Sequence, residues 1–478
     1  MNDNNVSKRG RRMGFVPGLR RLLVWSLVVS SSLQFASQSL EAEDLNHFVR
    51  LFDGSALHGT MKSLDPKNGL VWEHENALEP LQFEFPSLGS IRFNPSQRWK
   101  GGRQSQCRFR FTNGDEVYGK ILAMDESYID METWFGGALR ADREKVQSIA
   151  FLQNGYRVLY EGPNTLNEWV LGKSPNGWRY QDGVLSVTDR GVIGREMGIE
   201  DSASLAFDLS WEGTFQLTVT MHAETLDRYD YSKGAYVFFL SPQFVSFQRI
   251  QPGAGVMTLG QVRLTNLVNR TKARFDLRTH RDKSSFALLA DGEVIGTWKD
   301  SRGFVAKGSG VSFSSQVSRS TFSLSRILVT EWDGLFESDF EVDEEQQSDG
   351  LLLINRDQPI GIVKDIQDGK LNFNLRNRLD VKIPLERIKQ IQLHQSEPTD
   401  DTFEEEDVRV QISGGGSLSF VLDKWTDSLI EGTSRTFGAV QFNPNSIRQV
   451  ELNLERHRIE QLAAQEDPED VWDFEAEE

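Results

Sequence analysis

A polar loop that combines carboxylates with tyrosines is the segment of this sequence best suited to chemistry. It runs from His222 to Gly234 with the sequence HAETLDRYDYSKG. Carboxylates accept hydrogen bonds from hydroxyl groups and aromatic rings stack on flat apolar faces, a combination that suits sugar binding. Its candidate ligand-binding residues are Glu224, Asp227, Tyr229, Asp230 and Tyr231. The alternative is an ordinary solvated hairpin loop, because nothing in the sequence fixes the geometry of these side chains.

Tryptophan side chains offer a second route to sugar binding. The segment WEG at Trp211 is typical of a strand end with an exposed ring, so Trp211 joins the candidate ligand-binding residues. Trp178 and Trp298 are expected to be largely buried, because tryptophan more often fills the core of a β-sandwich or barrel than it lines a sugar platform.

Motifs for metal-dependent or nucleophilic catalysis are absent from the sequence. The seven histidines are scattered, with no HxH or HExxH pair and no cysteine at ligand spacing, so zinc and iron sites are not indicated. No GxSxG segment supplies a nucleophile elbow. We therefore expect no cofactor and assign no catalytic residue. Calcium held by Asp230 and nearby carbonyl groups stays an alternative, although no dense oxygen-ligand motif supports it.

The candidate loop lies within a long central segment, 155–333, that has the pattern of a β-sandwich. Short strand candidates follow one another at intervals of about 8 to 15 residues, separated by turn residues and without helical periodicity. So many short strands in one segment favour two packed antiparallel sheets. The loop would then connect two strands of one sheet.

Four stretches of the central segment resemble a known superfamily. They are LYEGPNTLNEWVLG from Leu159, GWRYQDGVLSV from Gly177, DSASLAFDLSWEGTFQLTVTM from Asp201 and RFDLRTHRDKSSFALLADGEVIGTW from Arg274. In this order they look like the concanavalin A-like lectin/glucanase superfamily, a laminin G-like sandwich, and within it the bacterial 3-keto-disaccharide hydrolase family. The resemblance implies a jelly-roll sandwich. It leaves open whether the protein binds a glycan or hydrolyses one, because the matching residues are turn and core signals.

An enzymatic alternative rests on the acidic run ESDFEVDEE, from Glu337 to Glu345. Laminarinase-like glucanases of the same superfamily carry a Glu-x-Asp-x-Glu strand, which places three carboxylates on one strand face. This run contains that spacing, but it follows the last expected strand of the sandwich. Dense acidic runs are more typical of solvated linkers, so 334–348 is predicted to be an acidic linker.

A short pattern recurs four times, twice before and twice after the sandwich. The copies begin at FDGSALHG (Phe52), TNGDEVYG (Thr112), INRDQPIG (Ile354) and SGGGSLSF (Ser413). The repeats span 46–94, 107–152, 349–394 and 407–452, with alternating apolar residues and Asn-Gly or Asp-Gly turns. Each is expected to be a small SH3-like or Sm-like barrel. We expect neighbouring copies to pack in pairs and the two pairs to meet.

The N-terminus is predicted to be an export signal. Residues 1–42 hold six basic and two acidic residues around an apolar run from Leu22 to Ala36, which is short for a membrane span. An uncleaved anchor is the alternative. The formal net charge of −17 disfavours nucleic acid as a partner. Cys107, the only cysteine, cannot form an intramolecular disulfide and is expected to pack in a strand core.

The sequence thus predicts an exported, all-β, multidomain protein of the bacterial periplasm or cell surface. Its expected activity is non-catalytic binding of a glycan or an envelope protein by the sandwich, with the flanking barrels serving assembly. A glycoside or 3-keto-disaccharide hydrolase and a structural scaffold without a small ligand are the alternatives. The tail, 455–478, is expected to be largely disordered, with one short helix around Ile459 to Ala464.

Overall fold

The computed structural model describes an almost entirely β protein. The described residues are 47–93, 101–102, 106–152, 156–173, 177–264, 267, 270–316, 321–332, 334, 348–376, 379–395, 403–404 and 406–465. The predicted export signal and the run from Glu337 to Glu345 lie outside them. The predicted C-terminal helix is confirmed and is longer than expected, since α1 spans Leu454–Gln465. None of the helices in these described stretches combines the length and apolarity that a membrane crossing requires.

The central segment is a sandwich of two antiparallel sheets, as predicted. The nine-stranded sheet contains β6 (Gly101–Gly102), β12 (Tyr156–Gly162), β14 (Trp178–Gln181), β15 (Val184–Val187), β17 (Ser202–Glu212), β22 (Lys272–His280), β23 (Ser285–Ala290), β24 (Glu293–Lys299) and β26 (Thr321–Glu331). The seven-stranded sheet has the order β13 (Val170–Leu171), β16 (Gly191–Glu196), β25 (Gly310–Ser315), β18 (Leu217–Ala223), β19 (Ala235–Leu240), β20 (Phe244–Gln251) and β21 (Gly255–Arg263).

Alternate residues of both sheets fill one core between them. In β17 the buried residues Leu205, Phe207 and Leu209 point inward, and in β18 Leu217 and Val219 do the same. The period-two pattern in the sequence therefore identified the strands correctly, because a sheet that packs on one side buries every second side chain.

The two tryptophans expected in this core differ in burial. Trp178 is 4 % exposed and packs edge-on against Phe322, as predicted. Trp298 is only partly buried, which corrects the expectation that it would be largely buried. It lies in the edge strand β24, where its ring packs over Gly260 of β21 and over Gly296. A Cβ at Gly260 would lie 2.0 Å from Trp298 Nε1, so glycine is required there.

The four repeats share one topology. The first repeat contains β1 (His47–Leu51), β2 (Ala56–Asp65), β3 (Gly69–Glu73), β4 (Leu81–Phe83) and β5 (Leu88–Phe93), and the second contains β7 (Gln106–Phe111), β8 (Glu116–Met124), β9 (Tyr128–Thr133), β10 (Gly137–Asp142) and β11 (Val146–Leu152). The third contains β27 (Asp349–Leu353), β28 (Ile360–Gln367), β29 (Lys370–Leu375), β30 (Asp380–Pro384) and β31 (Ile388–Gln392), and the fourth contains β32 (Asp407–Ile412), β33 (Ser417–Thr426), β34 (Ile430–Ser434), β35 (Gly438–Phe442) and β36 (Ile447–Glu451).

In each repeat four strands form a meander and the fifth returns to pair with the first. A short 3-10 helix precedes the fifth strand in every copy. The second strand carries a bulge at the same place in all four, as between Met61 and Ser63. Among the described strand pairings none joins the fourth strand of a repeat to its fifth. The identification as SH3-like or Sm-like barrels therefore stays a prediction.

The head glycines of the repeats are explained by close backbone approach. A Cβ at Gly59, Gly119 or Gly361 would lie 2.1 to 2.6 Å from a carbonyl oxygen of the third strand. The fourth repeat, whose sequence has lost this glycine, has Phe420 instead and places Gly432 beneath its ring. The glycine that the second strand of the fourth repeat has lost is thus compensated by a glycine in its third strand.

Cys107 occupies a position that is polar in two other repeats. Its thiol is buried, and it accepts a hydrogen bond from the Ile121 N–H at the bulge of the second strand. His47 and Asp349 bind the corresponding N–H groups of Met61 and Val363. Burial raises the pKa of Cys107 to about 12, so the thiol stays protonated and unreactive.

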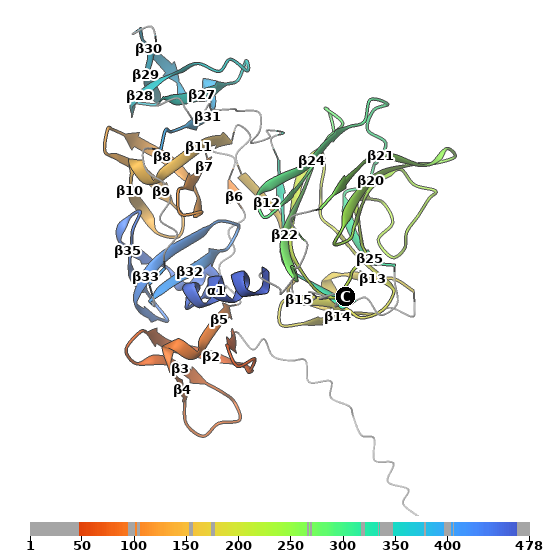
Figure 1. Ribbon diagram of the computed structural model, residues 1–478, viewed down its shortest axis with the longest axis horizontal. Helices are drawn as coiled ribbons and strands as arrows, with labels where there is room; N and C mark the ends of the chain where they lie inside the picture. The colour runs from red at the N-terminus through yellow and green to blue at the C-terminus, as the bar shows by residue number, and fades with distance from the viewer. Residues whose placement is uncertain are drawn as a thin grey trace, which may run out of the picture. The chain divides into compact units, whose positions relative to one another are not determined.

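The repeats are arranged in the order first, fourth, second, third, as Figure 1 shows in orange, dark blue, gold and light blue. The fifth strands pair first with fourth, at Ile91 and Val450, and second with third, at Ile149 and Ile391. The prediction that neighbouring copies pack in pairs is wrong for the first and second repeats and for the third and fourth. The prediction that the two pairs meet is confirmed, because each fifth-strand pairing joins one copy from before the sandwich to one from after it.

Candidate functional site

The predicted loop folds onto the outer face of the seven-stranded sheet. It connects β18 to β19, and Tyr229 packs against Ala235, Val237 and Ile250 on that face. The loop approaches closely because β16 presents Gly194, where a Cβ would lie 2.4 Å from the carbonyl oxygen of Leu226. The loop therefore forms a wall at one end of this face.

The three carboxylates of the loop are engaged within the loop itself. Asp230 accepts hydrogen bonds from the backbone and hydroxyl of Ser232 at 2.9 and 2.6 Å, and from Thr225 at 2.8 Å. These donors hold the pKa of Asp230 at about 2. Arg228 lies 3.2 Å from Asp227. An Asp230 carboxylate that stays ionised cannot serve as a general acid.

Glu224 is held in a similar way. Its carboxylate lies 3.3 Å from the Lys233 ammonium group. Among the described residues no group of three or more His, Cys, Asp or Glu side chains is arranged to hold a metal ion. The carboxylate oxygens of Asp230 accept hydrogen bonds from Ser232 and Thr225, and no set of calcium ligands is assembled around them among the described residues.

The two tyrosines of the loop have different roles. Their rings meet edge to face with centroids 4.7 Å apart. Tyr229 is partly buried against the sheet, and burial raises its pKa to about 12. Tyr231 is 61 % exposed and offers a ring face to a ligand. Tyr229 thus fixes the position of Tyr231.

Trp211 does not belong to this site. It is 4 % exposed, lies near the end of β17 in the other sheet, and contacts Phe215 with ring centroids 4.8 Å apart. The expectation of an exposed ring is wrong. Trp211 continues the inward-facing series of Leu205, Phe207 and Leu209, and this alternation decides its direction although it is near a strand end.

The floor of the outer face is lined by hydroxyl and amide side chains that the sequence analysis did not single out. Thr218 lies beside Ser314 in the register of β18 and β25, and Thr220 lies beside Ser312. Phe239 pairs with Ser246 on the other side. By strand alternation the polar side chains of this face are Thr218, Thr220, Ser246, Gln248, Thr258, Gln261, Arg263, Ser312 and Ser314. The signal was present as hydroxyl residues alternating with apolar ones in LTVTM and GVSFSS.

Several of these hydroxyl groups keep their hydrogen-bonding capacity. Ser246 and Ser314 accept bonds from Gln248 and Gln316 at 3.3 and 2.9 Å. The hydroxyls of Thr218, Thr220 and Ser312 bond to no side chain of the described chain, yet none is a buried unpaired atom. These three side chains are buried, at 3 to 9 % exposed.

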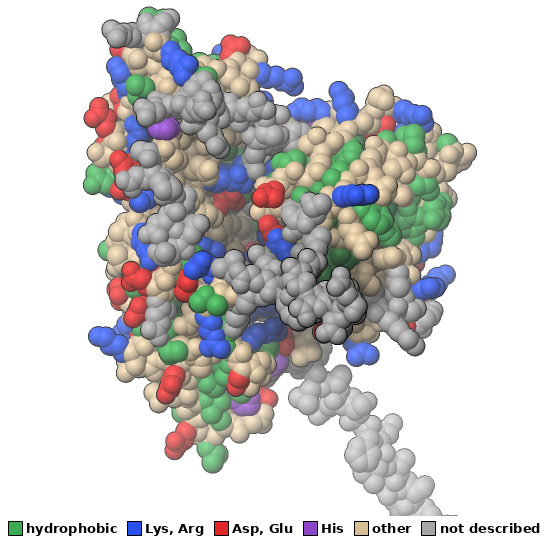
Figure 2. Space-filling view, viewed as in Figure 1, with side chains coloured by type: hydrophobic (Ala, Val, Ile, Leu, Met, Phe, Trp, Pro, Cys, Tyr) green, Lys and Arg blue, Asp and Glu red, His purple; other side chains and the backbone are tan. Residues whose placement is uncertain are grey.

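Charge on this face lies at the ends of its strands, at Glu196 of β16 and Arg263 of β21. Among the described residues of the seven strands, Glu196 supplies the single carboxylate, and it lies at the end of β16, where it accepts a bond from Gly198 N–H. A face of hydroxyls and amides with aromatic rings at its border suits a neutral polyhydroxylated ligand better than an ion. In the view of Figure 2, acidic and basic side chains are interspersed over the repeats.

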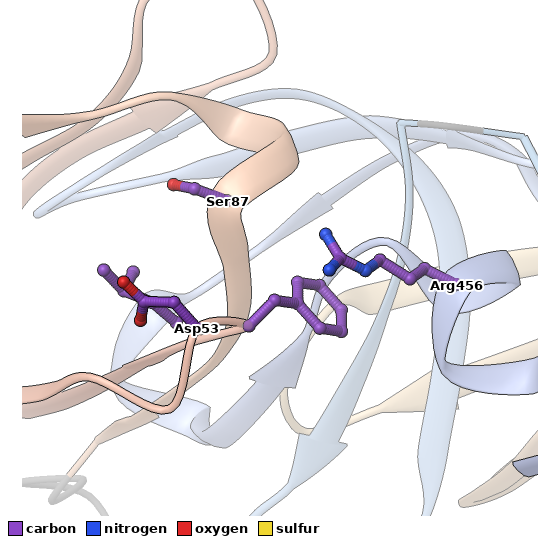
Figure 3. Close-up of a pocket in the computed structure, with 5 residues that line it drawn as sticks. Asp53, Ser87 and Arg456 are labelled. Atoms are coloured by element: carbon purple, nitrogen blue, oxygen red, sulfur yellow. The ribbon is translucent and has the colours of Figure 1, made fainter. Parts of the chain in front are cut away.

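A pocket elsewhere in the chain has a different character. It lies between the first repeat and α1, measures about 240 Å³, and is lined by Leu51, Phe52, Asp53, Ser87 and Arg456. Figure 3 shows Arg456 extending from the helix toward the first repeat. Its guanidinium stacks 4.0 Å from the Phe52 ring. These contacts fix α1 against the repeat, and the lining holds no pair of groups arranged for catalysis.

Comparisons with known proteins identify no family for this chain. No protein-family model and no curated protein matches the chain. Similar solved structures include a protein of unknown function with a galectin-like fold from Bacillus subtilis, at 13 % identity and a TM-score of 0.30, covering 36 % of this chain and 96 % of that one. Carbohydrate binding module CBM66 from Bacillus subtilis has 12 % identity and a TM-score of 0.26, covering 34 % and 96 %.

A third structure, LamAcat from Zobellia galactanivorans, has 9 % identity and a TM-score of 0.28, covering 36 % of this chain and 95 % of that one. All three matches span about a third of this chain.

Proposed function

We propose that this protein binds a neutral carbohydrate, without cleaving it, on the outer face of the seven-stranded sheet. The observation that carries the proposal is the row of hydroxyls of Thr218, Thr220 and Ser312, which bond to no side chain of the described chain. A buried site that leaves donors and acceptors unused is stabilised when a ligand supplies their partners. Sugar hydroxyls both donate and accept hydrogen bonds and carry no charge to desolvate.

The border of the face supports the same ligand class. Tyr231 presents an exposed ring at one end, and Phe239 stacks on Phe244 with centroids 6.0 Å apart at another. Pyranose rings bind aromatic faces through their apolar C–H surface. The carboxylates of the wall, Glu224, Asp227 and Asp230, are paired internally and serve to shape the loop.

The proposal includes export and assembly. The basic and apolar residues of 1–42 support an export signal. The four repeats would hold the sandwich at the cell envelope. Glu161 of β12 accepts bonds from Ser413 and Gly414 of the fourth repeat, both at 2.9 Å. Asp182 of the β14–β15 turn contacts His58 of the first repeat. Both contacts come from the nine-stranded sheet.

The test is a glycan array followed by calorimetry on the chain from Leu45 to Glu478. The double variant T218V/T220V keeps side-chain shape and removes two hydroxyls, so we expect at least a tenfold loss of affinity, or about 1.4 kcal/mol. T330V is the matched control, because Thr330 is a buried threonine on the other sheet. Equal glycan affinity of the double variant and the wild type would contradict the proposal.

Catalysis is tested with the same material. Disaccharides and β-glucans incubated with the protein should be recovered intact, since the Asp230 carboxylate stays ionised and cannot serve as a general acid. Release of reducing ends or of 3-keto sugars would show that the protein is a hydrolase. Absence of binding to every glycan, with intact folding, would favour the scaffold alternative.

A further inference from the structure

The second and fourth repeats meet through a contact with its own internal two-fold symmetry. Glu116 of β8 pairs with Ser417 of β33, and these two residues hold the same position in their repeats. Asp142 N–H donates to Thr436 O at 3.0 Å, and Asn443 N–H donates to Phe135 O at 3.2 Å. These two bonds are related by exchanging the repeats, because Asp142 and Asn443 both cap the 3-10 helix. We call this surface the head face.

The row of repeats therefore alternates two kinds of contact. Fifth strands join first to fourth and second to third, and head faces join fourth to second. Asp115 shows how well the head faces fit, since its carboxylate accepts bonds from Ser419 N–H and Oγ at 2.8 and 2.9 Å. Because the two kinds of contact alternate, the repeat at each end of the row would make its next contact through its head face.

The two end repeats differ in what covers their head faces. In the first repeat, His58 of the second strand contacts Asp182 of the sandwich. In the third repeat, the described strand pairings bring no other repeat to the start of β28. This face carries apolar residues where the second and fourth repeats have mostly polar or small ones. Ile360 matches Tyr118 and Ser419, Ile362 matches Lys120 and Val421, and Leu379 matches Gly137 and Gly438.

Exposure of these residues is unusual for aliphatic side chains. Ile362 is 56 % exposed and Leu379 is 54 % exposed, and Ile354 in the adjacent turn is 42 % exposed. Lys120 and Gly137, which match Ile362 and Leu379, are themselves exposed in the second repeat, so these apolar residues lie at the edge of the head face. Exposed aliphatic side chains gathered beside such a face mark an interaction surface. Pro384 holds the capping position of Asp142 and Asn443 and has no N–H to donate, so contact here depends on side chains.

We propose that two copies of this chain associate through the head faces of their third repeats. The established contact between the second and fourth repeats is two-fold, so the same face on two identical repeats is self-complementary. The resulting row would hold eight repeats with the alternation of contacts unbroken. It would also carry two sandwiches, which doubles the number of ligand faces. The proposal does not depend on what the sandwich binds.

Sedimentation velocity of the chain from Leu45 to Glu478, over a concentration series, tests the proposal. The wild type should shift from monomer to dimer. I362K, which places a positive charge on the apolar surface of both copies, should remain monomeric at every concentration. L78K is the matched control on the first repeat, where Leu78 is fully exposed, and it should dimerise like the wild type. A monomeric wild type, or a dimer that survives I362K, would overturn the proposal.

A cross-linking experiment locates the contact independently of the effect of I362K on folding. Cys107 is the only cysteine and is buried, so an introduced thiol is the only reactive one. Under mild oxidation I360C should form a disulfide-linked dimer, because Ile360 lies near the expected two-fold axis, and L78C should not. Cross-linking of L78C without I360C would place the contact elsewhere and refute the assignment.

Discussion

The outer faces of the two sandwich sheets differ in how their polar side chains are partnered. On the nine-stranded sheet Asp208 lies between Arg274 and Arg326 at 2.9 and 2.6 Å, and Asp276 binds Arg278 at 2.7 Å. On the seven-stranded sheet Thr218 and Thr220 keep unused hydroxyls and no charge lies beside them. Carboxylates that are held by arginines have little capacity left for a ligand, whereas hydroxyls without a side-chain partner retain it.

The largest effect expected from this contrast is on stability and concerns the charged face. D208A leaves Arg326 and Arg274 without their shared carboxylate in a buried place, which should cost about 3 to 5 kcal/mol of unfolding free energy. Urea denaturation measures this. Glycan affinity under native conditions should stay unchanged. A cost below about 1 kcal/mol, or a lost affinity in the folded variant, would mean that the two faces are not separate in function.

The next effect is the pH dependence of the same carboxylate. Burial raises the pKa of Asp208, but Arg326 and Arg274 outweigh it and hold the pKa at about 2. Because the folded pKa lies below the unfolded value of about 3.9, the contribution is present above that value and is lost as pH falls toward 2. It is on the order of 2 kcal/mol. The stability difference between wild type and D208N should therefore shrink on acidification. A difference independent of pH would contradict this.

The smallest effect sharpens the description of the hydroxyl face. Y231A removes the exposed ring at its border and should weaken glycan binding by about 1 kcal/mol without altering the melting temperature, since the ring is solvated. Y231F should bind like the wild type if stacking is the contribution. A loss with Y231F equal to that with Y231A would instead assign the effect to the hydroxyl group.

The sequence was sufficient for the strands of the sandwich and for the four repeats, because period-two alternation and head glycines are local signals. It placed Trp211 wrongly because an expected strand end outweighed the inward series of Leu205, Phe207 and Leu209. It missed Thr218 and Ser312 because their proximity depends on β18 pairing with β25, about 90 residues later in the chain. The sequence favoured the loop carboxylates as ligand-binding groups instead, although Asp230 accepts a hydrogen bond from Ser232 within the loop.

The order of the repeats could not be predicted from the sequence either, because it also depends on pairing between strands that are far apart in the chain. Ile149 and Ile391 have equivalent places in their copies, but so do Ile91 and Val450, and the sequence contains nothing that decides which fifth strands pair. Phe420 is instructive, because a lost glycine suggested decay and the compensating Gly432 lies across the strand. Pairwise compensation of this kind becomes visible only when the register is known.

The claim that the hydroxyl face binds the ligand is tested most directly by nuclear magnetic resonance of threonine methyl groups. The chain from Leu45 to Glu478 would be labelled at threonine and titrated with the glycan that the array identifies. The account predicts that the methyl signals of Thr218 and Thr220 shift with ligand while that of Thr330, on the charged sheet, does not. Shifts at Thr330 with Thr218 and Thr220 unmoved would contradict it.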